Sequence, residues 1–117
     1  MSLVDIDVQG DVFSSIVLET PASASYLKQG NEIALLFKET EVSIGKNLSG
    51  LISLRNRFKA KILRLEKSDI LAKVFLDYKG QEIISIITSR SVHKLGLIAG
   101  DEVEWLVKTN EVSLCNP

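Results

Sequence analysis

Side chains that donate hydrogen bonds gather in three short segments of this 117-residue sequence. The first is residues 51–58 (Leu-Ile-Ser-Leu-Arg-Asn-Arg-Phe), the second surrounds Thr88 and Ser91, and the third is residues 105–112 (Trp-Leu-Val-Lys-Thr-Asn-Glu-Val). Their Ser, Arg, Asn, Lys and Thr side chains all donate, and a helix beginning near Thr88 adds backbone N–H groups. Such donors suit a fully deprotonated oxyanion, which only accepts, so the segments predict an anion site. Surface solubility and helix capping are the competing explanation.

The groups that catalysis needs are missing. One histidine, His93, and one cysteine, Cys115, leave no Ser-His or Cys-His set, no His-His metal pair and no cysteine zinc site. The sequence has no glycine-rich phosphate loop and no catalytic pair of carboxylates. Asp7 and Asp77 adjoin turns, where a turn role is expected. We therefore expect a protein that is not an enzyme and that uses neither a metal ion nor a cofactor.

Composition argues against several other classes of function. The net charge is −1, with 14 basic and 15 acidic residues, no basic stripe and few aromatic residues, which argues against nucleic-acid binding. No apolar run approaches the length of a membrane span, and the start of the chain has no signal-peptide pattern. Direct contact with a membrane is therefore not expected. A single cysteine fits a reducing compartment, so we expect a cytoplasmic location.

The elements that must position the donors occur twice in the sequence. At an offset of 70 residues, 13 of 47 aligned positions are identical, where roughly three are expected by chance. The matches include the pairs Gly10/Gly80, Gly30/Gly100, Glu32/Glu102 and Lys38/Lys108. The repeat predicts one fold in two copies, residues 1–47 and residues 48–117.

Alternation and turn signals predict that each copy is mainly β. In the second copy we expect strands at 56–66, 73–78, 82–88, 102–108 and 111–114, a hairpin turn at 79–81, and a short helix at 89–95 between Ser89 as N-cap and Gly96 as C-cap. Five strands with one helix are typical of an OB-like barrel. We therefore predict two tandem OB-like five-stranded barrels, each with a short helix.

The strand at 56–66 has no counterpart in the first copy, because subtracting 70 places it before Met1. The first barrel is thus expected to be incomplete and to lack its own first strand. Either the chain was cut from a longer protein or another chain supplies that strand, since an open sheet edge favours aggregation.

Several motifs occur in the order typical of one family. They are Ser53-Leu54-Arg55-Asn56, Lys61-Ile62, the Gly80 hairpin, Ile87-Thr88-Ser89-Arg90-Ser91-Val92, Leu95-Gly96-Leu97, Ala99-Gly100-Asp101-Glu102-Val103 and Val107-Lys108-Thr109-Asn110-Glu111-Val112. On these residues the chain resembles the Mop, or molbindin, domain, a branch of the transport-associated OB (TOBE) fold, in a tandem arrangement. The match is dense from Ser53 to Leu114 and looser in the first copy.

The resemblance implies a ligand and the residues that bind it. Members of the family bind molybdate or tungstate as the bare oxyanion where barrels or subunits meet, which implies a homodimer or a larger assembly. Carried over residue by residue, the implied ligands are Ser53, Arg55, Asn56, Thr88, Ser91, Lys108 and Thr109, with Lys38 retained in the first copy. The first copy has Leu18, Pro21 and Glu39 where the second has Thr88, Ser91 and Thr109, so we expect no complete site there.

Three functions stay open at this point. The leading hypothesis is a molybdate-sensing or regulatory module of a molybdenum transport or homeostasis protein. Such a module is the C-terminal part of a molybdate-responsive transcription regulator or of a molybdate ABC transporter ATPase, or a free-standing molbindin. The alternative is a dimerisation or regulatory OB module that has lost anion binding. OB-type nucleic-acid binding is a third class, which the charge and the few aromatic residues disfavour.

Overall fold

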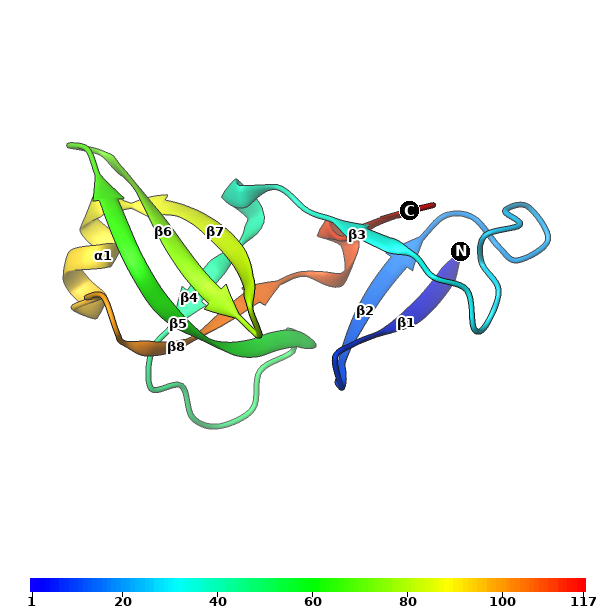
Figure 1. Cartoon of the computed structure of the whole chain (residues 1–117), viewed down its shortest axis with the longest axis horizontal. Helices are drawn as coiled ribbons and strands as arrows, with labels where there is room; N and C mark the ends of the chain where they lie inside the picture. Colours follow the sequence, from blue (N-terminus) through cyan, green and yellow to red (C-terminus); the bar gives the residue numbers. More distant parts are fainter.

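The computed structural model describes all 117 residues, which form one elongated, mainly β body of 47 × 28 × 26 Å (Figure 1). The strands are β1 Ser2–Val8, β2 Asp11–Val17, β3 Ala34–Leu36, β4 Ser43–Gly45, β5 Asn56–Lys67, β6 Leu71–Tyr78, β7 Gln81–Thr88, β8 Glu102–Val107 and β9 Ser113–Cys115. The helices are α1 Ser89–Leu95 and the 3₁₀ turns η1 Glu39–Glu41 and η2 Thr109–Glu111. None of them has the length and apolarity that crossing a membrane requires.

The second copy is a curled antiparallel sheet built around β5. The strand order is β4-β8-β5-β6-β7, with β4 and β7 at the two edges. The first half of β5 pairs with β8 from Asn56 to Lys61, and its second half pairs with β6 from Lys61 to Lys67. A register shift between Ile62 and Arg64 marks the change of partner and bends the strand. Because alternate side chains in the first half of β5 are buried, this strand supplies much of the core-facing surface.

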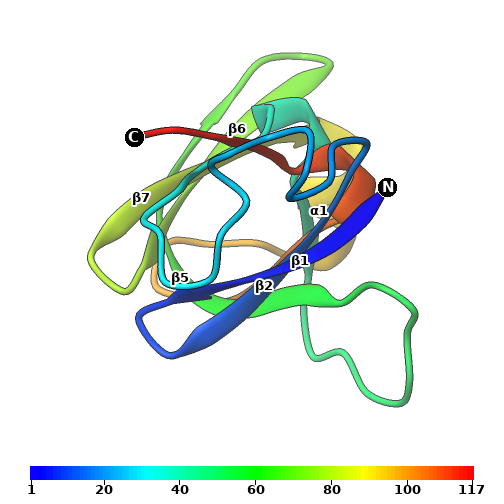
Figure 2. The same ribbon diagram turned by 90° about the vertical axis from the view of Figure 1, so that its right-hand side faces the viewer.

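The first-copy strands β1, β2 and β3 lie in two separate two-stranded ladders, β1–β2 and β3–β9, and β9 comes from the second copy. The β1–β2 hairpin lies at the end of the body opposite α1 (Figures 1 and 2). Its turn residues Gln9 and Gly10 have φ of 49° and 93°, and the turn residues Lys79 and Gly80 of the β6–β7 hairpin have φ of 51° and 87°. Positive φ at both positions defines a type I′ turn, which favours glycine. The hairpin turn predicted at residues 79–81 is therefore confirmed, and the first copy repeats it.

The two copies exchange their last strands. β4 pairs with β8 of the second copy through Ile44↔Trp105, and β9 pairs with β3 of the first copy through Leu35↔Leu114. The offset of 70 residues converts one register into the other, so the exchange obeys the internal repeat. The sheets consequently do not divide between residues 47 and 48, although the sequence repeat does.

One hydrophobic core joins both copies. Phe13 of β2 stacks on Phe58 of β5, with ring centroids 4.1 Å apart, and its ring lies 5.5 Å from Trp105. The ring of Tyr78 meets Trp105 edge-on at 5.1 Å. Stacked and edge-to-face aromatic contacts add to the burial of apolar area, so the copies form one packed body.

Two buried serines tie the exchanged segments to the opposite copy. Ser15 Oγ donates to the carbonyl of Val112 at 2.5 Å, and Ser85 Oγ donates to the carbonyl of Val42 at 2.6 Å. These pairs are related by the repeat, and they place η2 against β2 and η1 against β7.

The prediction of a short helix in each copy is wrong for the first copy, which has no α-helix. In the second copy α1 is capped by Thr88, whose Oγ1 accepts from the N–H of Ser91 at 3.0 Å. Leu18 and Pro21 occupy the matching positions in the first copy, and they offer neither the side-chain oxygen nor the N–H. Short hydrogen-bonded turns form there instead, with the carbonyl of Thr20 accepting from the N–H of Ala24 and the carbonyl of Ala24 accepting from the N–H of Leu27.

α1 has the predicted bounds, and only its N-cap differs from the prediction, by one residue. The N-cap is Thr88 rather than Ser89, because the capping hydrogen bond comes from the threonine hydroxyl. The predicted C-cap is confirmed, since Gly96 has the left-handed φ of 61° and its N–H donates to the carbonyl of His93.

Candidate functional site

The first and third donor segments meet at one end of the second-copy sheet. Asn56 at the start of β5 lies opposite Val107 at the end of β8, so Arg55 and Lys108 extend from neighbouring strand ends. Both side chains are exposed, and neither takes part in any ion pair of the structure. Two unpaired cations at adjacent strand ends form a surface that attracts an anion.

Arg57, the next basic residue on β5, is already occupied. Its guanidinium donates to both carboxylate oxygens of Glu104 across the β5–β8 pair, with Nη2 to Oε1 at 3.0 Å. The guanidinium holds the pKa of the Glu104 carboxyl below its ordinary value. Of the two arginines in the first segment, Arg55 is therefore the one free to bind an anion.

Lys108 and Thr109 are held in place by the η2 turn. The backbone of Lys108 is extended, and its carbonyl accepts from the N–H of Glu111 at 3.0 Å. Thr109 opens the turn and is half-buried, whereas Ser53 is exposed in the loop that leads into β5. The structure thus brings Arg55, Lys108 and Thr109 to one end of the sheet, with Ser53 two residues before Arg55.

Asn56 has a different environment from the other predicted ligands. Its side chain is fully buried, with Oδ1 accepting from the N–H of Ser14 at 2.7 Å and Nδ2 donating to the carbonyl of Ser14 at 2.8 Å. The amide therefore pairs with the backbone of β2 as a neighbouring strand would. Both polar atoms of this buried side chain contact Ser14, so it fixes the start of β5 to the first copy and does not face solvent.

Thr88 and Ser91 lie at the other end of the sheet from Arg55. Thr88 is opposite Leu71 on β6, beside the end of β5 that is remote from Asn56. The 12 residues of β5 span roughly 36 Å at about 3 Å per residue. The Thr88 hydroxyl also donates to Ser91 Oγ at 2.9 Å. One chain therefore does not bring these hydroxyls together with Arg55 and Lys108.

Lys38 lies on the turn that matches the one at Lys108. Its carbonyl accepts from the N–H of Glu41 at 2.9 Å, and its own N–H donates to Glu41 Oε1 at 3.2 Å. η1 packs against β7, whose last residue is Thr88, so Lys38 lies beside β7. η2 packs against β2, so Lys108 lies beside β2. We call these two contacts, η1 with β7 and η2 with β2, the two seams between the copies. The strand exchange thus divides the predicted ligands between the two seams.

A hydrogen-bonded cluster that the donor pattern did not predict locks the two hairpins together. The Tyr78 hydroxyl donates to Asp11 Oδ2 at 2.6 Å, and Lys79 Nζ lies 3.2 Å from the same oxygen. The tyrosine hydroxyl and then the lysine hold the pKa of the Asp11 carboxyl below its ordinary value, while burial and Asp11 raise the pKa of Tyr78. No spacing in the sequence links residues 67 positions apart, so only the fold identifies this cluster.

A second contact of this kind holds the linker between the copies. Lys46 Nζ donates to the carbonyl of Gly96 at 2.9 Å and to Asp101 Oδ2 at 3.0 Å. The N–H of Ile98, followed by Lys46, keeps the pKa of the Asp101 carboxyl below its ordinary value. Lys46 therefore stabilises the C-terminal end of α1 and has a structural role.

Known proteins with related sequences share one theme. The family model for the TOBE domain matches residues 52–114. The molybdenum import ATP-binding protein ModC of Brucella abortus is 34% identical over 111 residues, which cover 94% of this chain and 29% of ModC. The molybdenum-pterin-binding protein 1 of Clostridium pasteurianum is 39% identical over 64 residues, which cover 54% of this chain and 94% of that protein. The chain thus spans less than a third of the length of ModC.

Solved structures of molybdate-binding proteins also resemble this chain. The cytoplasmic molybdate-binding protein ModG, solved with molybdate bound, superimposes with a TM-score of 0.90 at 31% identity and covers 98% of this chain and 84% of ModG. A molybdate-binding protein from Sporomusa ovata is 42% identical, with a TM-score of 0.50, and covers 50% of this chain and 88% of that protein. The likeness to ModG extends over both copies, whereas the smaller protein matches about half of the chain.

Proposed function

This chain belongs to the TOBE-domain family, and from that premise we propose that it binds molybdate or tungstate as the bare oxyanion. Its role is that of a sensing or regulatory module in molybdenum transport or homeostasis, acting by binding and not by catalysis, in the cytoplasm. We further propose that residues 1–47 and 48–117 form two OB-like barrels of the tandem Mop type that exchange their last strands, the first barrel being incomplete. The likeness of both copies to ModG supports this reading.

The observation that carries the proposal is the pair of free cations, Arg55 and Lys108, at adjacent strand ends beside Thr109. Molybdate is a tetrahedral dianion, so charged donors form strong hydrogen bonds with its oxygens. A site made of donors disfavours phosphate, which is partly protonated at neutral pH and needs an acceptor. Sulfate has the same charge and shape with shorter bonds, so the size of the site must reject it.

The remaining ligands reach the anion in an assembly. Thr88 and Ser91 lie at the far end of the sheet from Arg55, so a single site that uses both groups needs a second protomer. We propose a homodimer or larger homo-oligomer in which Ser53, Arg55, Lys108 and Thr109 of one protomer meet Thr88, Ser91 and Lys38 of another. Asn56 takes part by anchoring the start of β5. Ligand at such a seam couples occupancy to assembly geometry, as a sensor requires.

Isothermal titration calorimetry with molybdate, tungstate, sulfate and phosphate tests the proposal. We expect heat with molybdate and tungstate, and affinities lowered at least about tenfold in Arg55→Ala and in Lys108→Ala, since each removes a charge-assisted hydrogen bond. Lys73→Ala is the matched control, because Lys73 is an exposed, unpaired lysine on β6. Absence of heat with all four anions on folded protein contradicts the proposal.

The alternative function is a dimerisation module that has lost its ligand. The commitment of the Asn56 amide to Ser14 and the residues Leu18, Pro21 and Glu39 of the first copy favour it. This function predicts an oligomer whose sedimentation is unchanged by molybdate and by Arg55→Ala. Analytical ultracentrifugation with and without molybdate separates the two functions.

A further inference from the structure

The outer edge of β1 has no strand beside it. In the second copy the matching strand β6 lies between β7 and β5, whereas β1 pairs with β2 alone. The two-residue turn makes Val8 and Asp11 a hydrogen-bonded pair. Alternation along the strand then directs the backbone groups of Leu3, Asp5 and Asp7 away from β2. These groups form a free sheet edge that can accept another strand.

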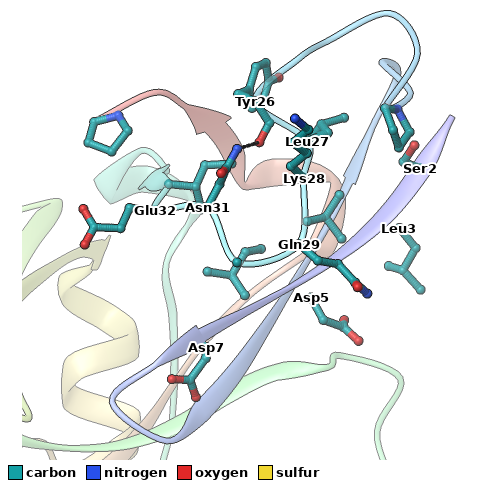
Figure 3. A pocket seen from close by; sticks show the side chains of 16 residues that line it. Ser2, Leu3, Asp5, Asp7, Tyr26, Leu27, Lys28, Gln29, Asn31 and Glu32 are labelled. Atoms are coloured by element: carbon teal, nitrogen blue, oxygen red, sulfur yellow. Dashed lines mark hydrogen bonds between the residues drawn. The ribbon is translucent and has the colours of Figure 1, made fainter.

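A groove runs along this edge. It is a cavity of about 1080 Å³ between β1 on one side and residues 26–33 on the other. Figure 3 shows Leu3, Asp5 and Asp7 along β1, and Lys28 and Glu32 on the loop that forms the other part of the lining. In the second copy the matching elements are β6 and residues 96–103, which lead into β8, and β5 lies between β6 and β8 and pairs with both.

A second hollow offers space for the inward-facing side chains of such a strand. Its volume is about 270 Å³, and its first-copy lining is Val8, Phe13, Ile33, Leu35 and Phe37. The repeat matches these residues to Tyr78, Ile83, Val103, Trp105 and Val107. In the second copy that set packs in the same core as Phe58, Ala60 and Ile62 of β5. The hollow is therefore the core position that inward-facing side chains of a β5-like strand fill.

The charges along the groove specify the outer face of the strand. Asp5, Asp7 and Glu32 outnumber the single basic residue Lys28 in the lining. In the second copy Lys61 of β5 lies opposite both Asp77 and Glu102, which match Asp7 and Glu32. Opposite charges on facing strand positions stabilise a pair, so a lysine on the incoming strand suits this groove.

We propose that the first copy is a strand acceptor. Its occupant is an extended peptide segment that alternates apolar and basic residues as Asn56–Lys67 does and adds to β1 in the antiparallel sense. Its backbone pairs with the free edge at Leu3, Asp5 and Asp7. Its apolar side chains enter the hollow beside Leu35 and Phe37, and its lysines face Asp7 and Glu32. Main-chain hydrogen bonds supply affinity, and the alternating pockets supply specificity.

Two experiments test this without assuming any ligand for the protein. In the first, a synthetic peptide of residues 54–67 is added to the unaltered chain, and amide hydrogen exchange is followed by NMR. In the second, a copy of residues 54–70 is fused directly before Met1, as residue 70 precedes Leu71, which raises the effective concentration of the strand. The control peptide and control fusion carry the changes that correspond to Phe58→Lys and Ile62→Lys. They add positive charge and remove the inward apolar groups.

We expect the amides of Leu3, Asp5 and Asp7 to exchange at least about tenfold more slowly in the fusion than in the unaltered chain, and the peptide to slow the same amides. The control versions are expected to leave these rates unchanged. Equal protection by test and control sequences, or protection by neither the fusion nor the peptide, overturns the proposal. It is also overturned if these amides are already protected in the unaltered chain in a concentration-dependent manner, because the occupant is then a second copy.

Discussion

The Asn56 side chain allows a sharp test of how the two copies are held together. Asn56→Ala removes both hydrogen bonds to Ser14, and the N–H and carbonyl of Ser14 then lie buried without partners. Each buried unsatisfied group costs about 1–3 kcal/mol, so we expect the free energy of unfolding to fall by about 2–6 kcal/mol. This is a large share of the stability of a small domain, which is about 5–15 kcal/mol.

Urea unfolding followed by the fluorescence of Trp105 measures this loss, because the single tryptophan lies in the core shared by both copies. Asn110→Ala is the matched control, since Asn110 is exposed and its side chain forms no hydrogen bond, and we expect a change within about 0.5 kcal/mol. Asn56→Asp retains only the acceptor and buries a charge, so it is expected to cost at least as much as Asn56→Ala. A loss in Asn56→Ala no larger than in Asn110→Ala would refute the assigned role.

Three further predictions concern stability. Thr88→Val removes the hydroxyl that caps α1, so unfolding by urea should show a loss of about 1 kcal/mol. Gly80→Ala forces a residue with a Cβ atom to a φ of 87°. Because left-handed backbone is unfavourable for such residues, we expect the free energy of unfolding to fall by about 1 kcal/mol or more, as measured by circular dichroism melting. Because Tyr78 and Lys79 hold the pKa of Asp11 below 3.8, the stability from this carboxylate is present above that pH and is lost as the pH falls through the lowered pKa. Asp11→Asn should therefore reduce the steepness of acid unfolding below pH 3.8, and an unchanged acid profile contradicts the assignment.

Local signals in the sequence predicted the elements well. The strands of the second copy were predicted to within two residues at each end, because alternation and turn glycines act over a few positions. The last strand was predicted at 111–114 but spans Ser113–Cys115, since η2 takes up residues 109–111. The helix wrongly predicted for the first copy shows that the repeat transfers the scaffold but not the capping chemistry, which Leu18 and Pro21 do not provide.

Part of the candidate site could also be predicted from local sequence. Arg55 and Lys108 were singled out as donors, and the β5–β8 register places them at adjacent strand ends. The donor pattern could not distinguish Arg55 from Arg57, because the ion pair between Arg57 and Glu104 depends on which strands become neighbours. It likewise could not show that the amide of Asn56 is used by Ser14, 42 positions earlier.

By itself the sequence determined the β character, the repeat of 70 residues, the hairpin turns and the donor segments, because these depend on residue type and short spacing. Only the tertiary structure decided that β4 and β9 each pair with a strand of the other copy, that Thr88 lies far from Arg55, and that a groove lies open beside β1. Strand partners are chosen by burial of side chains distant in the chain, as in the contact of Phe13 with Phe58. The donors are thus a property of the sequence, whereas their division between the two seams is a property of the fold.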